Sequence, residues 1–151
     1  MPHIHEKVDF TVEVFVVYKN KVLLRLHEKY KIWLSVGGHI ELDEEPNQAA
    51  LREVKEEVGL DVELIDAQRP FEQNTKDYTE LIPPKFMNIH TINETHRHIA
   101  LTYFARATTD EVKPEKADDQ WKWLDAKELG AMDLRPSIKY YAQKALEELA
   151  S

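Results

Sequence analysis

The stretch GGHIELDEEPNQAALREVKEEVGL, residues 37–60, places seven acidic side chains among twenty-four residues. Pro46 is typical of the first turn of a helix and Gly59 of the position just past its end, so we predict a helix of about thirteen residues between them. Three apolar residues recur at helical spacing and are predicted to pack on the core: Leu51, Val54 and Val58. The segment is therefore predicted to form a loop, a helix and a second loop.

The acidic side chains of the predicted helix are spaced so that they repel one another. Glu53, Glu56 and Glu57 fall at i, i+3 and i+4 on a second face of the helix. A bound divalent cation would offset this repulsion, because Mg²⁺ takes oxygen ligands. A solvated acidic face without a metal is the alternative that the spacing alone leaves open.

A longer pattern carries more information than the spacing of the acids. Its nine fixed positions are Gly38, Glu44, Arg52, Glu53, Val54, Glu56, Glu57, Gly59 and Leu60. This pattern resembles the signature, or box, of the Nudix (MutT-like) hydrolase family at every fixed position. The resemblance continues more loosely outside the box (residues 38–60), with Trp33 upstream, Trp123 and Leu124 late in the chain, and a helix at the end.

The resemblance implies an α/β protein with the Nudix fold, a mixed β-sheet sandwiched between α-helices, and we expect residues 1–151 to form a single domain of this kind. It also implies Mg²⁺- or Mn²⁺-dependent hydrolysis of a pyrophosphate bond in a nucleoside diphosphate linked to another moiety. Nucleoside triphosphates, nucleotide sugars and dinucleoside polyphosphates are such substrates. A non-catalytic nucleotide-binding sensor of the same fold is the alternative, although the carboxylates of the box are all in place.

Taken position by position, the resemblance assigns roles within the box. The expected metal-binding and catalytic carboxylates are Glu53, Glu56 and Glu57. The backbone carbonyl of Gly37 is an expected further metal ligand, and Glu44 and Arg52 are expected to form an ion pair that ties the loop to the helix. Glu53 is the candidate for orienting or deprotonating the attacking water. Because water is a poor nucleophile and a diphosphate is anionic, divalent cations would both activate the water and neutralise charge.

Five candidate substrate-binding residues follow from residue type and position: Arg25, Trp33, Tyr78, His96 and His98. Arg25 and Trp33 suit contacts with phosphate and base, or are ordinary surface and core residues. Tyr78 lies at the offset beyond the box where similar enzymes acting on dinucleoside polyphosphates carry a tyrosine. His96 and His98 would share one strand face and contact phosphate or transfer protons, unless they are two ordinary histidines.

The composition limits the partners that we expect. The chain has 28 acidic and 20 basic residues and a net charge of −8. This balance argues against a nucleic acid polymer, whose binding depends on Lys and Arg neutralising phosphates, so the expected partner is a small-molecule nucleotide. No apolar run approaches a membrane span, residues 1–10 lack the apolar stretch of a signal peptide, and cysteine is absent, so we expect a cytoplasmic protein without membrane contact. A homodimer is left open, because dimers are common among similar proteins.

Patterns outside the box predict the remaining elements. Apolar, aromatic and β-branched residues predict strands at 10–18, 21–26, 62–65, 96–107 and 120–124, and helical spacing predicts a closing helix at 136–149. Residues 66–95, which contain three prolines, are predicted to form a long loop. Glu45 is a poorer N-cap than Ser, so we expect a weakly held start to the box helix.

Overall fold

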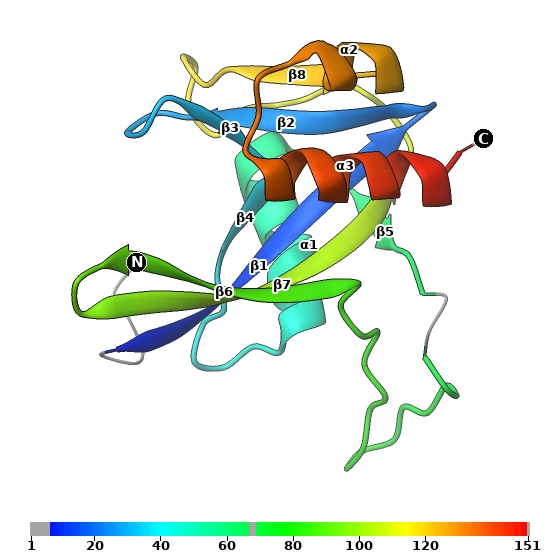
Figure 1. The fold of residues 1–151 in the computed structure, drawn as a ribbon. Coiled ribbons are helices and arrows are strands. Elements are labelled where there is room, and N and C mark those ends of the chain that lie inside the picture. The colour runs from blue at the N-terminus through cyan, green and yellow to red at the C-terminus, as the bar shows by residue number, and fades with distance from the viewer. Residues whose placement is uncertain (1–6, 67–68, 151) are drawn as a thin grey trace.

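The computed structural model describes residues 7–66 and 69–150 (Figure 1). The elements are β1 (Val8–Tyr18), β2 (Lys21–His27), β3 (Ile32–Leu34), β4 (Val36–His39), α1 (Pro46–Val58), β5 (Val62–Leu64), β6 (Phe86–Asn93), β7 (His96–Ala107), β8 (Trp121–Leu124), α2 (Ala126–Ala131) and α3 (Pro136–Glu148). Every strand and helix predicted above is present, with bounds within two residues of those predicted.

No helix in these ranges is long and apolar enough to cross a membrane. The signal-peptide prediction for residues 1–6 lies outside the described residues.

The strands of the described chain form one mixed sheet. Its path runs β3-β2-β1-β7-β5, with β4 added on β1, β6 on β7 and β8 on β2. β1 and β7 run parallel, and the other pairings are antiparallel. β1 pairs with β2 near its end, where Val17 lies opposite Val22, and with β4 farther back, where Val12 lies opposite Gly38. β1 therefore pairs both with β2 and with β4, the strand that leads into the box.

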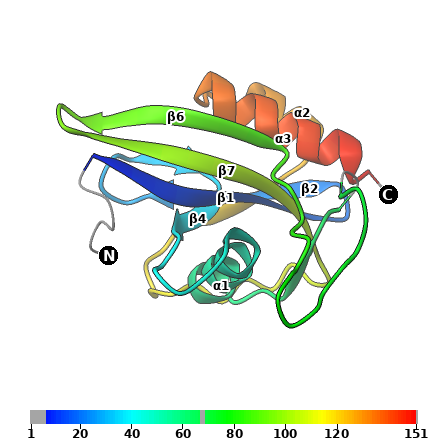
Figure 2. The same ribbon diagram turned by 90° about the horizontal axis from the view of Figure 1, so that it is seen from below.

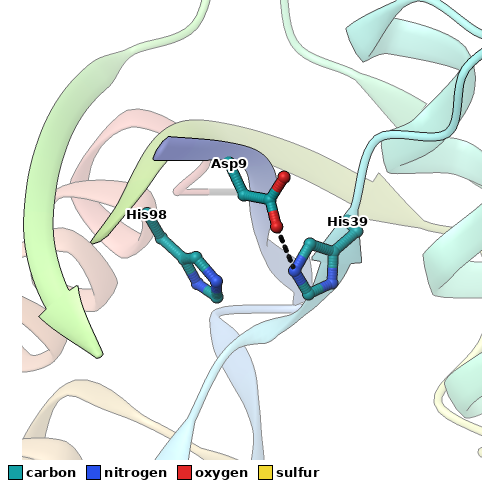
Figure 3. Close-up of side chains that lie close together, drawn as sticks. All are labelled: Asp9, His39 and His98. Atoms are coloured by element: carbon teal, nitrogen blue, oxygen red, sulfur yellow. Dashed lines mark ion pairs between the residues drawn. The ribbon is translucent and has the colours of Figure 1, made fainter. Parts of the chain in front are cut away.

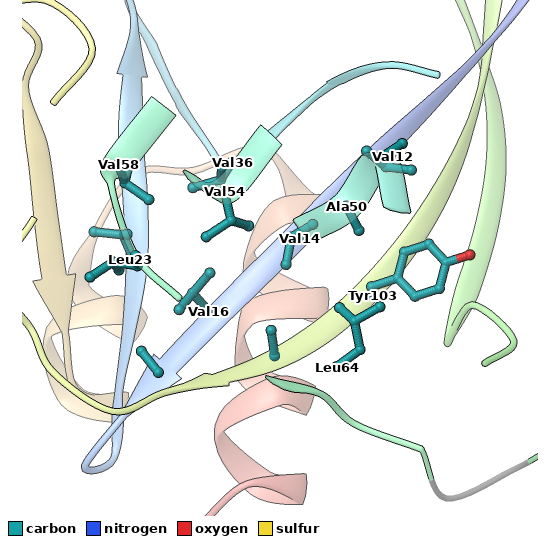
Figure 4. Close-up of a cluster of buried hydrophobic side chains, with 14 residues drawn as sticks. Val12, Val14, Val16, Leu23, Val36, Ala50, Val54, Val58, Leu64 and Tyr103 are labelled. Carbon is teal, nitrogen blue, oxygen red and sulfur yellow. The ribbon is translucent and has the colours of Figure 1, made fainter. Parts of the chain in front are cut away.

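Helices cover both faces of this sheet, with α1 on one side and α2 and α3 on the other (Figure 2). Successive side chains of a strand point to opposite faces, so β1 contributes to two cores. The α1 side takes Val12, Val14 and Val16, and the α3 side takes Phe15 and Val17. In the cluster on the α1 side, Val54 and Val58 of the helix meet these strand valines (Figure 4). The mixed sheet between helices confirms the fold that the box resemblance implies.

The box helix α1 is capped more firmly than its sequence predicts. The Glu45 carboxylate accepts a hydrogen bond from the backbone N–H of Gln48 at 2.9 Å, and the Gln48 side chain accepts one from the backbone N–H of Glu45 at 3.1 Å. The expectation of a weak helix start is wrong, because this reciprocal capping box satisfies both amides. At the other end Gly59 adopts a left-handed conformation with φ of 68°, as its place just past the helix predicts.

The prediction that Leu51 packs on the core is wrong, because its side chain is 43% exposed. The helix instead buries Ala49, Ala50, Val54 and Val58. Two adjacent alanines on the buried face let the helix backbone lie close to the sheet. The buried stripe is therefore centred on Ala50 and Val54, and Leu51 lies at its edge.

The predicted loop at 66–95 is wrong over residues 86–93, which form β6 and pair antiparallel with β7. Most β6 side chains are exposed, so no alternation of apolar and polar residues marks this strand in the sequence. The described residues from 69 to 85 form no longer strand, although Asn74 and Thr79 make an isolated bridge. The short strands β3 and β4 were also not predicted.

The burial difference between two neighbouring helix residues leads to a stability prediction. Val54→Ala should lower the free energy of unfolding by about 2 kcal/mol, because it removes fully buried methyl groups and leaves a cavity. Leu51→Ala, the matched control, should lower it by less than about 1 kcal/mol. Urea unfolding followed by circular dichroism measures both, and equal losses in the two variants would contradict the packing described here.

Candidate active site

Two glycines of β4 bring the sheet and the box helix into close approach. A Cβ on Gly37 would lie 2.0 Å from the backbone oxygen of Val12 on the neighbouring strand. A Cβ on Gly38 would lie 2.5 Å from the carboxylate oxygen Oε1 of Glu53. The absence of both side chains lets β4 pair tightly with β1 and lets the Glu53 carboxylate rest against the strand backbone.

Arg52 ties the loop, the strand end and the helix together. Its Nε and Nη2 atoms donate to the two carboxylate oxygens of Glu44 at 2.9 and 2.6 Å, and Nη2 also donates to the backbone oxygen of His39 at 2.9 Å. Nη1 donates to Glu53 at 2.8 Å and to Glu56 at 3.1 Å. The hydrogen bond from Arg52 lowers the pKa of Glu44, and the pKa of Arg52 is raised in return. The two side chains expected to pair therefore form a forked, charge-assisted contact.

The three acidic residues of the helix differ in burial. The side chains of Glu53 and Glu57 are 12% and 17% exposed, whereas that of Glu56 is 51% exposed. The Glu57 carboxylate accepts hydrogen bonds from the backbone N–H of Gly37 and from Nη1 of Arg25, both at 2.8 Å. Loss of water nevertheless raises the pKa of Glu57 to about 7, and burial also raises the pKa of Glu53.

This donor set fits a divalent cation. The three carboxylates offer the oxygen atoms that a hard cation takes. At present two arginines serve as their counter-charges: Arg52 contacts Glu53 and Glu56, and Arg25 contacts Glu57. Because the pKa of Glu53 and of Glu57 still lies above its ordinary value, these arginines balance the buried charge only in part. A divalent cation would supply the missing positive charge.

A cavity of about 280 Å³ lies next to these carboxylates. Strand β4 contributes Gly37, Gly38 and His39 to its wall and the box helix contributes Glu57, and the neighbouring strands contribute Thr11, Glu13, Arg25, His90 and His98. Residues of six strands and one helix residue, Glu57, line the cavity. Its size is close to the lower end of the range for small-molecule sites.

Two of the five candidate substrate residues line this cavity. Arg25 lies beside Glu57 and also contacts Asp119 at 3.4 Å. His98 lines the cavity too, and burial, together with the neighbouring imidazoles, lowers its pKa to about 4. His96 is buried deeper and does not line the cavity, although its Nε2 atom lies 3.3 Å from the Asp9 carboxylate.

The other two candidates lie elsewhere. Trp33 packs against the core on the α3 side, with Nζ of Lys122 5.1 Å from its ring centre, and it does not line the cavity. Tyr78 lies in the irregular segment before β6, where it is 47% exposed and stacks on Phe71. The structure therefore does not bring Trp33 and Tyr78 to the carboxylates.

The structure also places residues in the cavity wall that sequence reasoning missed. Glu13 accepts a hydrogen bond from the Thr102 hydroxyl at 3.0 Å and one from the Asn88 amide at 3.3 Å. Asp9 and Thr11 lie on the same face of β1 as Glu13, at alternate positions of an otherwise apolar strand. This row of polar residues was the available signal, since polar side chains on one face of a central strand need a polar surrounding.

Comparisons with known proteins agree with this geometry. Residues 9–145 match the family model described as NUDIX domain. A crystal structure of a NUDIX family hydrolase from Clostridium perfringens is 38% identical and superposes with a TM-score of 0.81 over 93% of this chain and 97% of that one. An RNA pyrophosphohydrolase from Gluconacetobacter diazotrophicus is 29% identical over 101 residues, 62% of this chain and 57% of that enzyme. The dihydroneopterin triphosphate diphosphatase of Escherichia coli is 44% identical over 59 residues, 36% of this chain and 39% of that enzyme.

The contacts of Arg52 lead to a second stability prediction. Arg52→Ala should lower the free energy of unfolding by about 3 kcal/mol at neutral pH, because it removes the guanidinium that donates to the carboxylates of Glu44 and Glu53. Lys55→Ala, which removes only an exposed ion pair with Asp61, should change it by less than about 0.5 kcal/mol.

The destabilisation caused by Arg52→Ala should depend on pH, because the pKa of Glu44 is lowered in the folded protein. A carboxyl whose folded pKa is depressed stabilises the fold above its ordinary value of 4.5 and loses that contribution as the pH falls through the folded pKa. The difference in the free energy of unfolding between wild type and Arg52→Ala should therefore become smaller at acid pH. Urea unfolding at neutral and acid pH tests this, and a gap that stays constant would contradict the role given to the pair.

Proposed function

This chain belongs to the NUDIX domain family, and on that premise we propose that it hydrolyses a pyrophosphate bond in a nucleoside diphosphate linked to another moiety, with Mg²⁺ or Mn²⁺ as the cofactor. The observation that carries the proposal is the cavity that joins Glu57 of the box to Arg25. It sets a largely buried carboxylate and a guanidinium side by side in the wall of a hollow that suits a small ligand. An anionic substrate and a cation would both find a counter-charge there.

The residues that would hold the cation are Glu53, Glu56 and Glu57, with the backbone carbonyl of Gly37. When bound, the cation supplies charge neutralisation and an activated water. The protein orients these groups beforehand: Arg52 holds Glu53 and Glu56, and the backbone N–H of Gly37 holds Glu57. Carboxylates fixed in this way need little rearrangement when substrate arrives.

Glu53 is the residue that we assign to the attacking water, where it would orient the water or accept its proton. Its raised pKa makes it a better proton acceptor than an exposed glutamate. Arg25 is assigned to a substrate phosphate, because its planar guanidinium suits phosphate oxygens and already lies in the cavity wall. His98, on the same wall, is a further candidate for phosphate contact.

A small nucleotide is the substrate class that we favour. The names of the two curated relatives, RNA pyrophosphohydrolase and dihydroneopterin triphosphate diphosphatase, share the cleavage of a phosphate anhydride. The net charge of −8 disfavours the long phosphate backbone of a polymer, while one nucleotide's phosphates can be neutralised locally by the cation and Arg25. Nucleoside triphosphates, nucleotide sugars and dinucleoside polyphosphates all satisfy this chemistry.

A panel of these nucleotides, incubated with Mg²⁺ and analysed by phosphorus NMR, tests the proposal. We expect turnover of at least one member, and Glu57→Gln should lower it by at least about 100-fold, because loss of a metal ligand costs at least as much as loss of an outer-shell partner. Glu63→Gln, which changes an exposed glutamate of β5, is the matched control and should retain full activity.

Two outcomes would contradict this assignment. Equal Mg²⁺-dependent turnover in wild type and Glu57→Gln would remove the box carboxylate from the reaction. Tight binding of one nucleotide without turnover of any member would favour the alternative, a nucleotide-binding sensor of the same fold.

The contact between Gly38 and Glu53 gives a separate prediction. Gly38→Ala should displace the flexible Glu53 carboxylate and lower turnover by about tenfold or more, while the free energy of unfolding changes by less than about 1 kcal/mol. Gly130→Ala is the control, because a Cβ there meets no atom within 4 Å, so its turnover should equal that of wild type. Turnover assays and urea unfolding on the same preparations separate the two effects, and full activity in Gly38→Ala would argue against the role of Glu53.

A further inference from the structure

A second group of metal-ligand side chains lies apart from the three carboxylates of α1. Asp9, His39 and His98 each offer one ligand atom, and these atoms all lie within 4.8 Å of one another. The three side chains converge from three different strands (Figure 3). Two of them, His39 and His98, also line the cavity that contains Glu57.

Strand pairing brings these residues together. In the parallel pair of β1 and β7, Asp9 lies opposite His98, so the two side chains share one face of the sheet. In the antiparallel pair of β1 and β4, His39 lies opposite Thr11, two residues from Asp9. The arrangement therefore follows from the central register of the sheet and does not depend on a surface loop.

The carboxylate in this cluster is deeply buried. The Asp9 side chain is only 2% exposed, and its Oδ2 atom lies 3.4 Å from Nε2 of His39 and 3.3 Å from Nε2 of His96. A buried carboxylate is costly unless positive charge or hydrogen bonds surround it. A divalent cation bound beside this carboxylate would supply a full counter-charge.

The donor types differ from those of the box. Two imidazole nitrogens and one carboxylate oxygen form the set that zinc takes in sites with three protein ligands and one open position. Mg²⁺ prefers oxygen atoms throughout, so it is poorly matched to this cluster. His96, which approaches the same Asp9 oxygen, would hold the carboxylate in place as an outer-shell partner.

We propose that Asp9, His39 and His98 form a second metal site, which takes a borderline divalent cation such as Zn²⁺ or Co²⁺. Because His39 and His98 line the cavity, a cation held by them would lie at the wall of the space where a ligand of the cavity would lie. This site differs from the carboxylate face of the box because two of its three donors are imidazole nitrogens. It does not depend on the proposed hydrolase function, since binding can be measured without substrate.

Cobalt titration in the presence of excess Mg²⁺ tests this site, because Mg²⁺ occupies oxygen-only positions while Co²⁺ bound by imidazole gives visible d–d absorption bands. Wild type should bind one Co²⁺ with such bands, and Zn²⁺ should displace it, as isothermal titration calorimetry would record. His39→Gln and His98→Gln should each weaken Co²⁺ binding by about 100-fold or more. Asp9→Asn, which preserves the shape of the buried side chain, should also weaken it, and circular dichroism checks that each variant folds.

Two controls isolate the cluster. His27→Gln removes an imidazole that lines the same cavity but stacks on Tyr30, with ring centres 5.0 Å apart, so Co²⁺ affinity should not change. The double variant His3→Gln, His5→Gln removes two imidazoles that lie outside the described residues, and it should retain the bands.

The proposal is overturned if wild type shows no d–d bands, or if His39→Gln and His98→Gln bind Co²⁺ as tightly as wild type. It is also overturned if the bands disappear in the His3, His5 variant and persist in both of the others. Should His98→Gln fail to fold, the Co²⁺ affinities of wild type, His39→Gln and Asp9→Asn still test the proposal, and equal affinities in the three would overturn it.

Discussion

The contact on which the candidate active site depends most is the fork between Arg52 and Glu44. It joins a loop residue to a helix residue, and the same guanidinium reaches the backbone oxygen of His39 at the end of β4. The nitrogen that remains, Nη1, points at Glu53 and Glu56. One side chain thus fixes the distance between strand and helix and the direction of two carboxylates. Its charge keeps those acids together, where without it they would repel each other along the helix.

The central strand β1 sets the second constraint. Its side chains alternate between the two faces of the sheet, and its α3-side face changes character along its length. Where α3 covers it, that face carries Phe15 and Val17, and where the helix ends it carries Asp9, Thr11 and Glu13. The apolar half builds a core, and Thr11 and Glu13 of the polar half line the cavity. One face of β1 therefore contributes to the core at one end and to the candidate site at the other.

The box could be predicted from sequence because each of its positions meets a local requirement. A helix start, a helix end and a row of carboxylates all lie within residues 38–60, where spacing translates directly into geometry. The ion pair of Glu44 and Arg52 followed from the family resemblance. Errors arose where a tertiary contact decided the outcome. The helix buries Ala49 and Ala50 on the sheet side, so Leu51 lies outside the core. Residues 86–93 form a strand because they pair with β7, although their own sequence pattern is weak.

The cavity was less accessible to sequence reasoning for the same reason. Its wall combines residues from β1, β2, β3, β4, β6 and β7, and only the register of the sheet decides which of them meet. His96 and His98 were proposed by residue type, and of the two only His98 lines the cavity. Nothing in the sequence links them to Asp9 or His39, which lie in other strands. The predictions of a single domain over residues 1–151, of cytoplasmic location and of a homodimer stay predictions.

Charge explains how an acidic protein can accept an anionic ligand here. The net charge of −8 would repel a nucleotide if it were spread evenly over the cavity. The wall instead combines the carboxylates of Glu13 and Glu57 with the Arg25 guanidinium, and the imidazoles of four histidines make up much of its polar remainder: His27, His39, His90 and His98. Carboxylates alone are offered by the helix, whereas the strands offer imidazoles together with the Asp9 carboxylate. A hard cation would therefore be drawn to one side of the cavity and a borderline cation to the other, and each would convert a repulsive surface into one that attracts phosphate.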